Sequence, residues 1–189
     1  MQEIKFTFND GLRVGENCIP YWGEISWIIS HIHSKFQELF KENKLQNSYP
    51  IFLDNADGNF SGHAPIIIPM FGKVLLIKLR LNELKNIGRI YYQYAHEFTH
   101  AMFYCELGID KKIADSEEEA ICTAASLLFV NKYCPSQLED CKKDALQCEL
   151  YRGGVPLADE MEYDFEIFKR YFYEYCRQYR DKHRTAIAS

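Results

Sequence analysis

The sequence has few of the features that would place a chain outside the ordinary globular class. Its 189 residues contain no internal repeat and no low-complexity tract, and six prolines and ten glycines are too few for a linker that divides the chain. Its apolar runs are shorter than the roughly 20 residues of a membrane span. A formal net charge of -5 argues against nucleic acid as a direct ligand. We therefore expect one domain over residues 1–189 without a membrane segment.

Paired cysteines are also missing. The chain has seven cysteines, an odd number, and no C-x-x-C pair, so neither a closed disulfide framework nor a cysteine zinc knuckle is expected. The first residues, 1–8, alternate like a strand and lack the basic start, apolar run and cleavage site of a secretory signal. We expect reduced thiols and a cytoplasmic protein.

What the sequence does contain is a succession of strand and helix patterns. After an opening strand, residues 21–44 have isoleucines at helical spacing, and three extended stretches then predict a small, mostly antiparallel sheet. The helical period returns at about Asn86, and Gly108 is well placed to end that helix. The expected fold class is α+β. The extended stretches are 49–53, 64–70 and 73–81, and the later helices are expected over about 116–133, 136–150 and 159–179.

The helix that starts near Asn86 carries a metal-binding pattern. His96 and His100 are four residues apart, so both rings lie on one face and can hold one ion. Glu97 follows the first histidine and would lie beside the ion, where a carboxylate can take a proton from metal-bound water. The apolar stripe of this helix points to nearly the opposite side, while Tyr92 and Phe103 share the side of the histidines. This arrangement predicts a covered cleft.

A catalytic zinc site needs a third protein ligand, and the start of the next helix offers candidates. The run Asp115–Ala120 contains three glutamates. Acidic residues in a first turn are also explained by the helix dipole and by a capping box, and a cap at Asp115 would assign Glu118 to that box. Glu119 is therefore the preferred ligand, with Glu118 as the alternative.

These residues resemble a known family. The motif His96-Glu97-Phe98-Thr99-His100, followed by Gly108 and then by Glu119-Ala120, resembles the gluzincin branch of zinc metallopeptidases. The acidic run before Ala120 is similar to the minimal, ImmA/IrrE-type peptidases. The resemblance implies a zincin-like domain, in which a small sheet packs on an N-terminal helix and on the HExxH helix and further helices follow.

The resemblance also implies residue roles. His96, His100 and Glu119 would bind Zn²⁺, and Glu97 would be the general base. Larger relatives often carry an aspartate four residues after the ligand glutamate to support a histidine; this chain has Thr123 there, and we consider Thr123 and Ser126 as replacements.

The function that follows is a zinc-dependent metallopeptidase, in which Glu97 activates a zinc-bound water to hydrolyse a peptide or protein substrate. The substrate would lie along a sheet edge, at residues 73–81 or the neighbouring strand. The group that stabilises the oxyanion is left open, with Tyr151, Arg152 and His183 as candidates. The alternatives are a catalytically silent zincin-fold binding or regulatory protein, and a hydrolase acting on a non-peptide bond.

Overall fold

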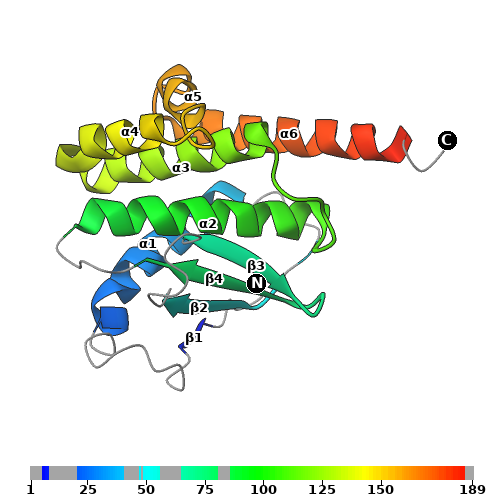
Figure 1. Cartoon of the computed structure of the whole chain (residues 1–189), viewed down its shortest axis with the longest axis horizontal. Coiled ribbons are helices and arrows are strands. Elements are labelled where there is room, and N and C mark those ends of the chain that lie inside the picture. Colours follow the sequence, from blue (N-terminus) through cyan, green and yellow to red (C-terminus); the bar gives the residue numbers. More distant parts are fainter. Residues whose placement is uncertain are drawn as a thin grey trace.

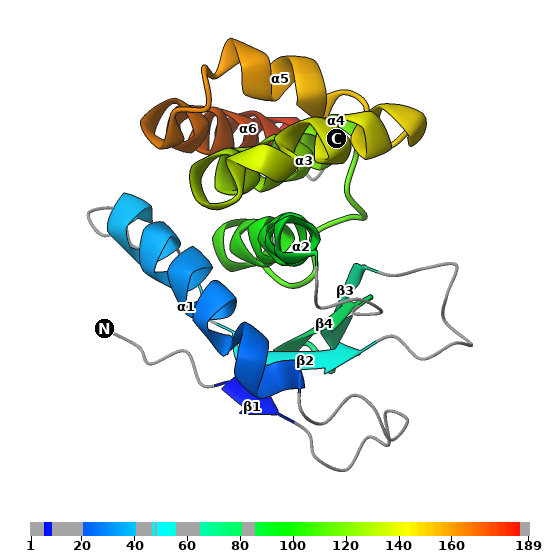
Figure 2. The ribbon, with the colours of Figure 1, turned by 90° about the vertical axis from the view of Figure 1, so that its left-hand side faces the viewer.

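The structure, a computed structural model, describes residues 6–8, 21–40, 47, 49–55, 65–80 and 86–185. It is built in layers (Figures 1 and 2): the sheet lies on one side, α2 (Ile87–Leu107) runs across it, and α3 (Ser116–Tyr133) lies on the other side of α2 with the later helices. The helix α1 (Tyr21–Phe40) lies beside α2. The helix that carries the histidine motif is therefore the central layer, which explains why nearly all of it is buried.

Four strands form the described sheet, in the order β1-β2-β4-β3. Their bounds are β1 Phe6–Phe8, β2 Ile51–Asn55, β3 Ile66–Met70 and β4 Val74–Leu79. The pairs β1–β2 and β2–β4 are parallel, and only β3–β4 is antiparallel. The expectation of a mostly antiparallel sheet was therefore wrong, although the α+β class is confirmed.

The connections explain the mixed sheet. A helix, α1, connects β1 to β2, and such a crossover places the two strands parallel. Only β3 and β4 are joined by a tight hairpin, in which Phe71 and Gly72 both have positive φ. Side chains alternate along β4, where Leu75, Ile77 and Leu79 are fully buried. These buried side chains form the part of the core that lies under α2.

The C-terminal half is helical. After α3 come η2 (Pro135–Gln137), α4 (Leu138–Gln147), α5 (Gly154–Glu160) and α6 (Phe165–Thr185). The short α5 was not expected, and a helix beginning at Asp159 was wrong because Glu162 and Tyr163 both have positive φ, which interrupts an α-helix. The cap of α6 is Asp164, whose side chain accepts hydrogen bonds from the backbone N–H groups of Glu166 and Ile167.

An aromatic cluster joins the helical layers. The ring of Phe36 on α1 lies 4.9 Å from Phe98 on α2, 5.6 Å from Phe129 on α3 and 6.1 Å from Phe168 on α6. These rings belong to one hydrophobic core that also includes the buried residues of the sheet. Along the described stretches, no helix has both the length and the apolar character to cross a bilayer.

Candidate metal centre

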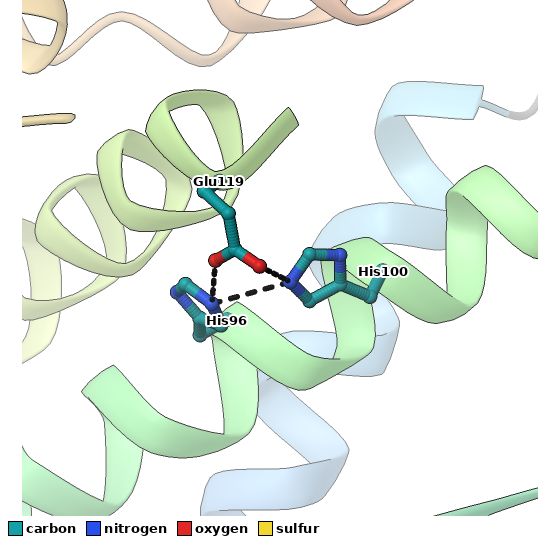
Figure 3. Close-up of side chains that lie close together, drawn as sticks. All are labelled: His96, His100 and Glu119. Carbon is teal, nitrogen blue, oxygen red and sulfur yellow. Dashed lines mark hydrogen bonds and ion pairs between the residues drawn. The ribbon is translucent and has the colours of Figure 1, made fainter. Parts of the chain in front are cut away.

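The two histidines lie one turn apart on the face of α2 that is turned toward α3. Their ring centroids are 5.0 Å apart, and the Nε2 atoms of His96 and His100 are separated by 3.3 Å (Figure 3). Both rings are almost completely buried. Two imidazole nitrogens therefore face one point between the helices.

Glu119 reaches the same point from the first turn of α3. Its Oε2 lies 3.2 Å from Nε2 of His96, and its Oε1 lies 3.6 Å from Nε2 of His100 (Figure 3). Ligands held tetrahedrally at about 2.0 to 2.1 Å from a zinc ion lie about 3.3 Å from one another. The separation between the two Nε2 atoms and that between Nε2 of His96 and Oε2 of Glu119 are close to this value, whereas the separation of 3.6 Å ends on the other carboxylate oxygen. The three residues form a group that could hold a metal ion.

The start of α3 decides which glutamate reaches this point. The side chain of Asp115 accepts hydrogen bonds from the backbone N–H groups of Glu117 and Glu118 and so fixes the first turn. Adjacent helical residues diverge by about 100°, so Glu119 points to the histidine nitrogens while Glu118 passes behind His100. The structure therefore brings together His96, His100 and Glu119, and it does not place the alternative, Glu118, among the candidate ligand atoms.

Glu97 lies beside the three residues without joining them. Its side chain is 3% exposed. Burial, with a further contribution from the charge of Glu119, raises its pKa to about 8, against the opposing effects of His100 and of the backbone amide of Ile67 on β3. A carboxyl group with a pKa near neutrality can both accept and return a proton.

Electrostatics distinguish the two histidines. Burial lowers the pKa of His96, against the opposing effect of Glu119. Burial also disfavours the charged form of His100, but interactions with Cys122, Glu118 and Glu119 outweigh it and raise its pKa well above the ordinary value. Despite burial, hydrogen bonds from both histidines hold the pKa of Glu119 below its usual range. A proton on His100 therefore pairs with Glu119, and a metal ion must displace it to bind.

A cleft opens on the His96 side. It has a volume of about 540 Å³ and is lined by the N-terminal half of α2, by α4 and by Tyr151. Tyr92 is part of its wall, whereas Phe103 is fully buried and stacks on Phe172 of α6 at 4.5 Å. The site is thus partly covered by the later helices and partly accessible through the cleft.

Of the three candidates for the oxyanion group, the structure brings one to the site. The ring of Tyr151 lies 4.9 Å from that of His96. Arg152 is largely exposed and 3.7 Å from Glu149, and the ring of His183 contacts that of Tyr179 edge to face near the end of α6, with centroids 4.2 Å apart. Arg152 and His183 are therefore not part of this site.

The two replacements considered for the supporting aspartate also differ. Thr123 Oγ1 lies 3.5 Å from Nδ1 of His96, at the limit of a hydrogen bond. Ser126 instead donates to the backbone carbonyl of Cys122 in its own helix, so it supports neither histidine.

The sequence interpretation considered Glu118 only as a capping residue or as the alternative ligand, and it missed Lys111 and Tyr175 altogether. Glu118 lies 2.8 Å from Nδ1 of His100, and Lys111 and Tyr175 contact Glu118 in turn. Lys111, in a loop, carries no sequence signal of its own.

The strand next to the site is β3, the outer strand of the described sheet, rather than β4, which lies between β2 and β3. Its Ile67 is the strand residue whose backbone amide acts on Glu97. Comparison of the chain with protein-family models, with curated proteins and with solved structures gave no match.

Proposed function

We propose that this protein is a zinc-dependent metallopeptidase of the gluzincin type. The observation that carries the proposal is the set of three separations, 3.2, 3.3 and 3.6 Å, between the facing atoms of His96, His100 and Glu119. Two imidazole nitrogens and one carboxylate from these residues would hold a zinc ion, and a catalytic site of this composition would keep a further position for solvent or substrate. Glu97 is on the same helix as the two histidines, and its carboxyl group interacts electrostatically with His100 and Glu119.

The donor set favours a transition-metal ion such as zinc over calcium and magnesium. Two imidazole nitrogens and one carboxylate oxygen suit zinc, whereas calcium and magnesium prefer all-oxygen sites. When bound, the zinc ion would supply a Lewis acid that polarises a carbonyl group and makes water a better nucleophile.

Glu97 is the proposed general base and then general acid. Its carboxylate accepts the proton of the attacking water and delivers it to the leaving amine nitrogen. Its burial keeps bulk water away from the carboxyl group, so the proton that it accepts is passed to the leaving amine. Tyr151 is the proposed donor to the oxyanion, because its ring packs on His96 at the cleft.

The outer strand favours a peptide substrate over a small ester. The amide of Leu75 on β4 donates to Pro50 and thus points away from β3. Leu75 pairs with Pro69 on β3, so the backbone of Pro69 points to the edge of β3 that has no partner strand among the described residues. Ile67, two residues earlier, points to the same edge. An extended peptide could add to this edge by backbone hydrogen bonds, next to Glu97. A cytoplasmic setting is part of the proposal, in keeping with the free cysteines among the described residues.

The test is zinc content and peptide cleavage in Glu97→Gln. We expect the wild-type protein to bind one zinc ion and cleave peptides from an unbiased library, and the variant to keep the zinc while losing at least about 10²-fold in rate. Glu106→Gln is the matched control, because Glu106 is also a buried glutamate of α2 but pairs with Arg180 away from the site.

Three results would redirect the proposal. A wild-type protein that takes up no zinc contradicts the metal centre. Zinc without cleavage of any peptide or ester favours a silent zincin-fold binding or regulatory protein, and cleavage of esters alone favours a non-peptide hydrolase.

A further inference from the structure

The face of His100 that points away from the candidate metal ligands meets a buried carboxylate. Nδ1 of His100 lies 2.8 Å from Oε1 of Glu118, and Glu118 is fully buried. Since Nε2 of the same ring is the atom that faces His96 and Glu119, an N–H at Nδ1 that donates to Glu118 leaves the lone pair on Nε2. The ring is therefore held in the orientation that metal binding requires, and displacement of a proton from Nε2 leaves the tautomer in which Nδ1 carries the N–H.

Glu118 is itself held from the loop between α2 and α3. Nζ of Lys111 lies 2.8 Å from Oε1 and 2.9 Å from Oε2 of Glu118. Both side chains are 1% exposed, and the ammonium group also lies 4.5 Å from the ring centroid of Tyr104. A buried carboxylate requires such a partner, because an uncompensated charge in the interior is strongly unfavourable.

The C-terminal helix completes the arrangement. The hydroxyl group of Tyr175 on α6 lies 3.3 Å from Oε2 of Glu118 and 3.2 Å from Oδ1 of Asp115, the cap of α3. Tyr175 is 4% exposed. A residue of α6, far along the chain from the histidine motif, therefore contacts both the first turn of α3 and the carboxylate behind His100.

We infer that Glu118 is a positioning residue of the metal centre, which fixes the His100 ring and is itself fixed by Lys111 and Tyr175. This inference rests on the proposed metal site. It differs from the support expected from the family resemblance, which would come from the position four residues after Glu119 and would act on the other histidine. It also gives α6 a part in metal binding. Ligating histidines commonly donate their second N–H to a carboxylate, and loss of such a partner lowers metal affinity about 10- to 100-fold.

The experiment measures Zn²⁺ affinity by competition with a chromophoric chelator, and Co²⁺ coordination by visible absorption, in the full-length protein. Glu118→Gln alone leaves Lys111 buried without its carboxylate, so the decisive variant is Glu118→Gln combined with Lys111→Met. Removing both charges while keeping an apolar stem is compatible with folding. We expect the double variant to fold and to bind Zn²⁺ about 10- to 100-fold more weakly than the wild type, with an altered Co²⁺ spectrum.

Two further variants separate positioning from packing. Glu106→Gln removes another buried, ion-paired glutamate from the α2–α6 contact and should leave the Zn²⁺ affinity unchanged. Tyr175→Phe should lower the affinity less than the double variant does, and an unchanged affinity would remove α6 from the inference.

Wild-type affinity in the folded double variant would overturn the role of Glu118, because it would mean that Glu118 serves only to neutralise Lys111. A wild-type protein that binds neither Zn²⁺ nor Co²⁺ would instead contradict the proposed metal centre itself. Metal binding without peptide cleavage would contradict only the peptidase activity, and the affinity comparison would still decide the role of Glu118.

Discussion

The two histidines of the centre differ in what lies behind them. Nδ1 of His100 lies 2.8 Å from the carboxylate of Glu118, in a buried group that includes Lys111. Among the described residues, the hydrogen-bond partner of Nδ1 of His96 is the hydroxyl group of Thr123, at 3.5 Å, and the ring of His96 lies next to that of Tyr151 at the cleft. The proposed ion site thus has a closed side at His100 and an open side at His96. The difference indicates that the ring held more firmly in one orientation is that of His100. Substrate would reach the site from the His96 side, where the cleft opens.

The largest effect on the open side is expected from Tyr151→Phe. Phenylalanine keeps a ring against His96 but removes the hydroxyl group that we assign to the oxyanion, so kcat should fall about 10²-fold or more. Steady-state kinetics with a cleaved peptide, together with Zn²⁺ titration, would show lost turnover at unchanged metal affinity. His183→Ala, at the other end of the helical layer, should behave like the wild type. Unchanged kcat in Tyr151→Phe would take the tyrosine out of the reaction.

Gly154→Ala should disturb the packing of α5 against α3 at Thr123, the residue that lies next to His96. A Cβ atom at Gly154 would lie 2.3 Å from Cβ of Thr123 and 2.8 Å from the carbonyl oxygen of Ala120, so α5 must move away from α3. We expect the free energy of unfolding to fall by about 1 to 3 kcal/mol, measured by denaturant titration. At Gly153 the added Cβ would meet only Cβ of Ala120, at 3.4 Å. Gly153→Ala should therefore stay within about 0.5 kcal/mol of the wild type, and equal losses in both variants would contradict the packing argument.

A smaller effect should appear in the pH dependence of metal binding, and it belongs to the closed side. The pKa of His100 is raised above its ordinary value of 6.5, so its proton is still bound at neutral pH and the ion displaces it. Zn²⁺ affinity should therefore rise about tenfold per pH unit until the raised pKa is passed. For the protein without an ion, the same proton stabilises the fold fully below pH 6.5, and this contribution is lost as pH rises through the raised pKa.

Calorimetry in buffers of different ionisation enthalpy would count the protons released when Zn²⁺ binds. A count of zero, with an affinity that does not change between about pH 6 and pH 8, would mean that His100 is already neutral before the ion arrives.

Local patterns in the sequence predicted the parts of the site that one element determines. The spacing of His96 and His100 is a property of a single helix, and the phase of α3 after its cap at Asp115 favoured Glu119. The parallel pairing of β1 with β2 and of β2 with β4 depends on connections and long-range contacts that periodicity does not report.

The residues behind His100 could not be predicted from the sequence either, because they also depend on contacts between distant parts of the chain. Lys111, Glu118 and Tyr175 come from a loop and two helices, and only the packing of α6 against α3 brings them together. The short α5 was missed because Gly153, Gly154 and Pro156 indicate a turn, yet a proline is tolerated in the first turn of a helix. The positions of single chemical groups on one element were thus predictable, whereas of the contacts between elements only the approach of Glu119 to the two histidines was expected, from the family resemblance.

The edge strand β3 affects whether copies of this protein can associate through their sheets. An exposed strand edge is a template on which a second chain can extend the sheet, and proteins often block such growth with proline. Pro69 lacks the N–H that a continuous ladder would need at the edge, whereas Ile67 keeps its own next to Glu97. Self-association through this edge is therefore disfavoured, while the backbone carbonyl groups of Ile67 and Pro69 can still accept hydrogen bonds from a short stretch of polypeptide.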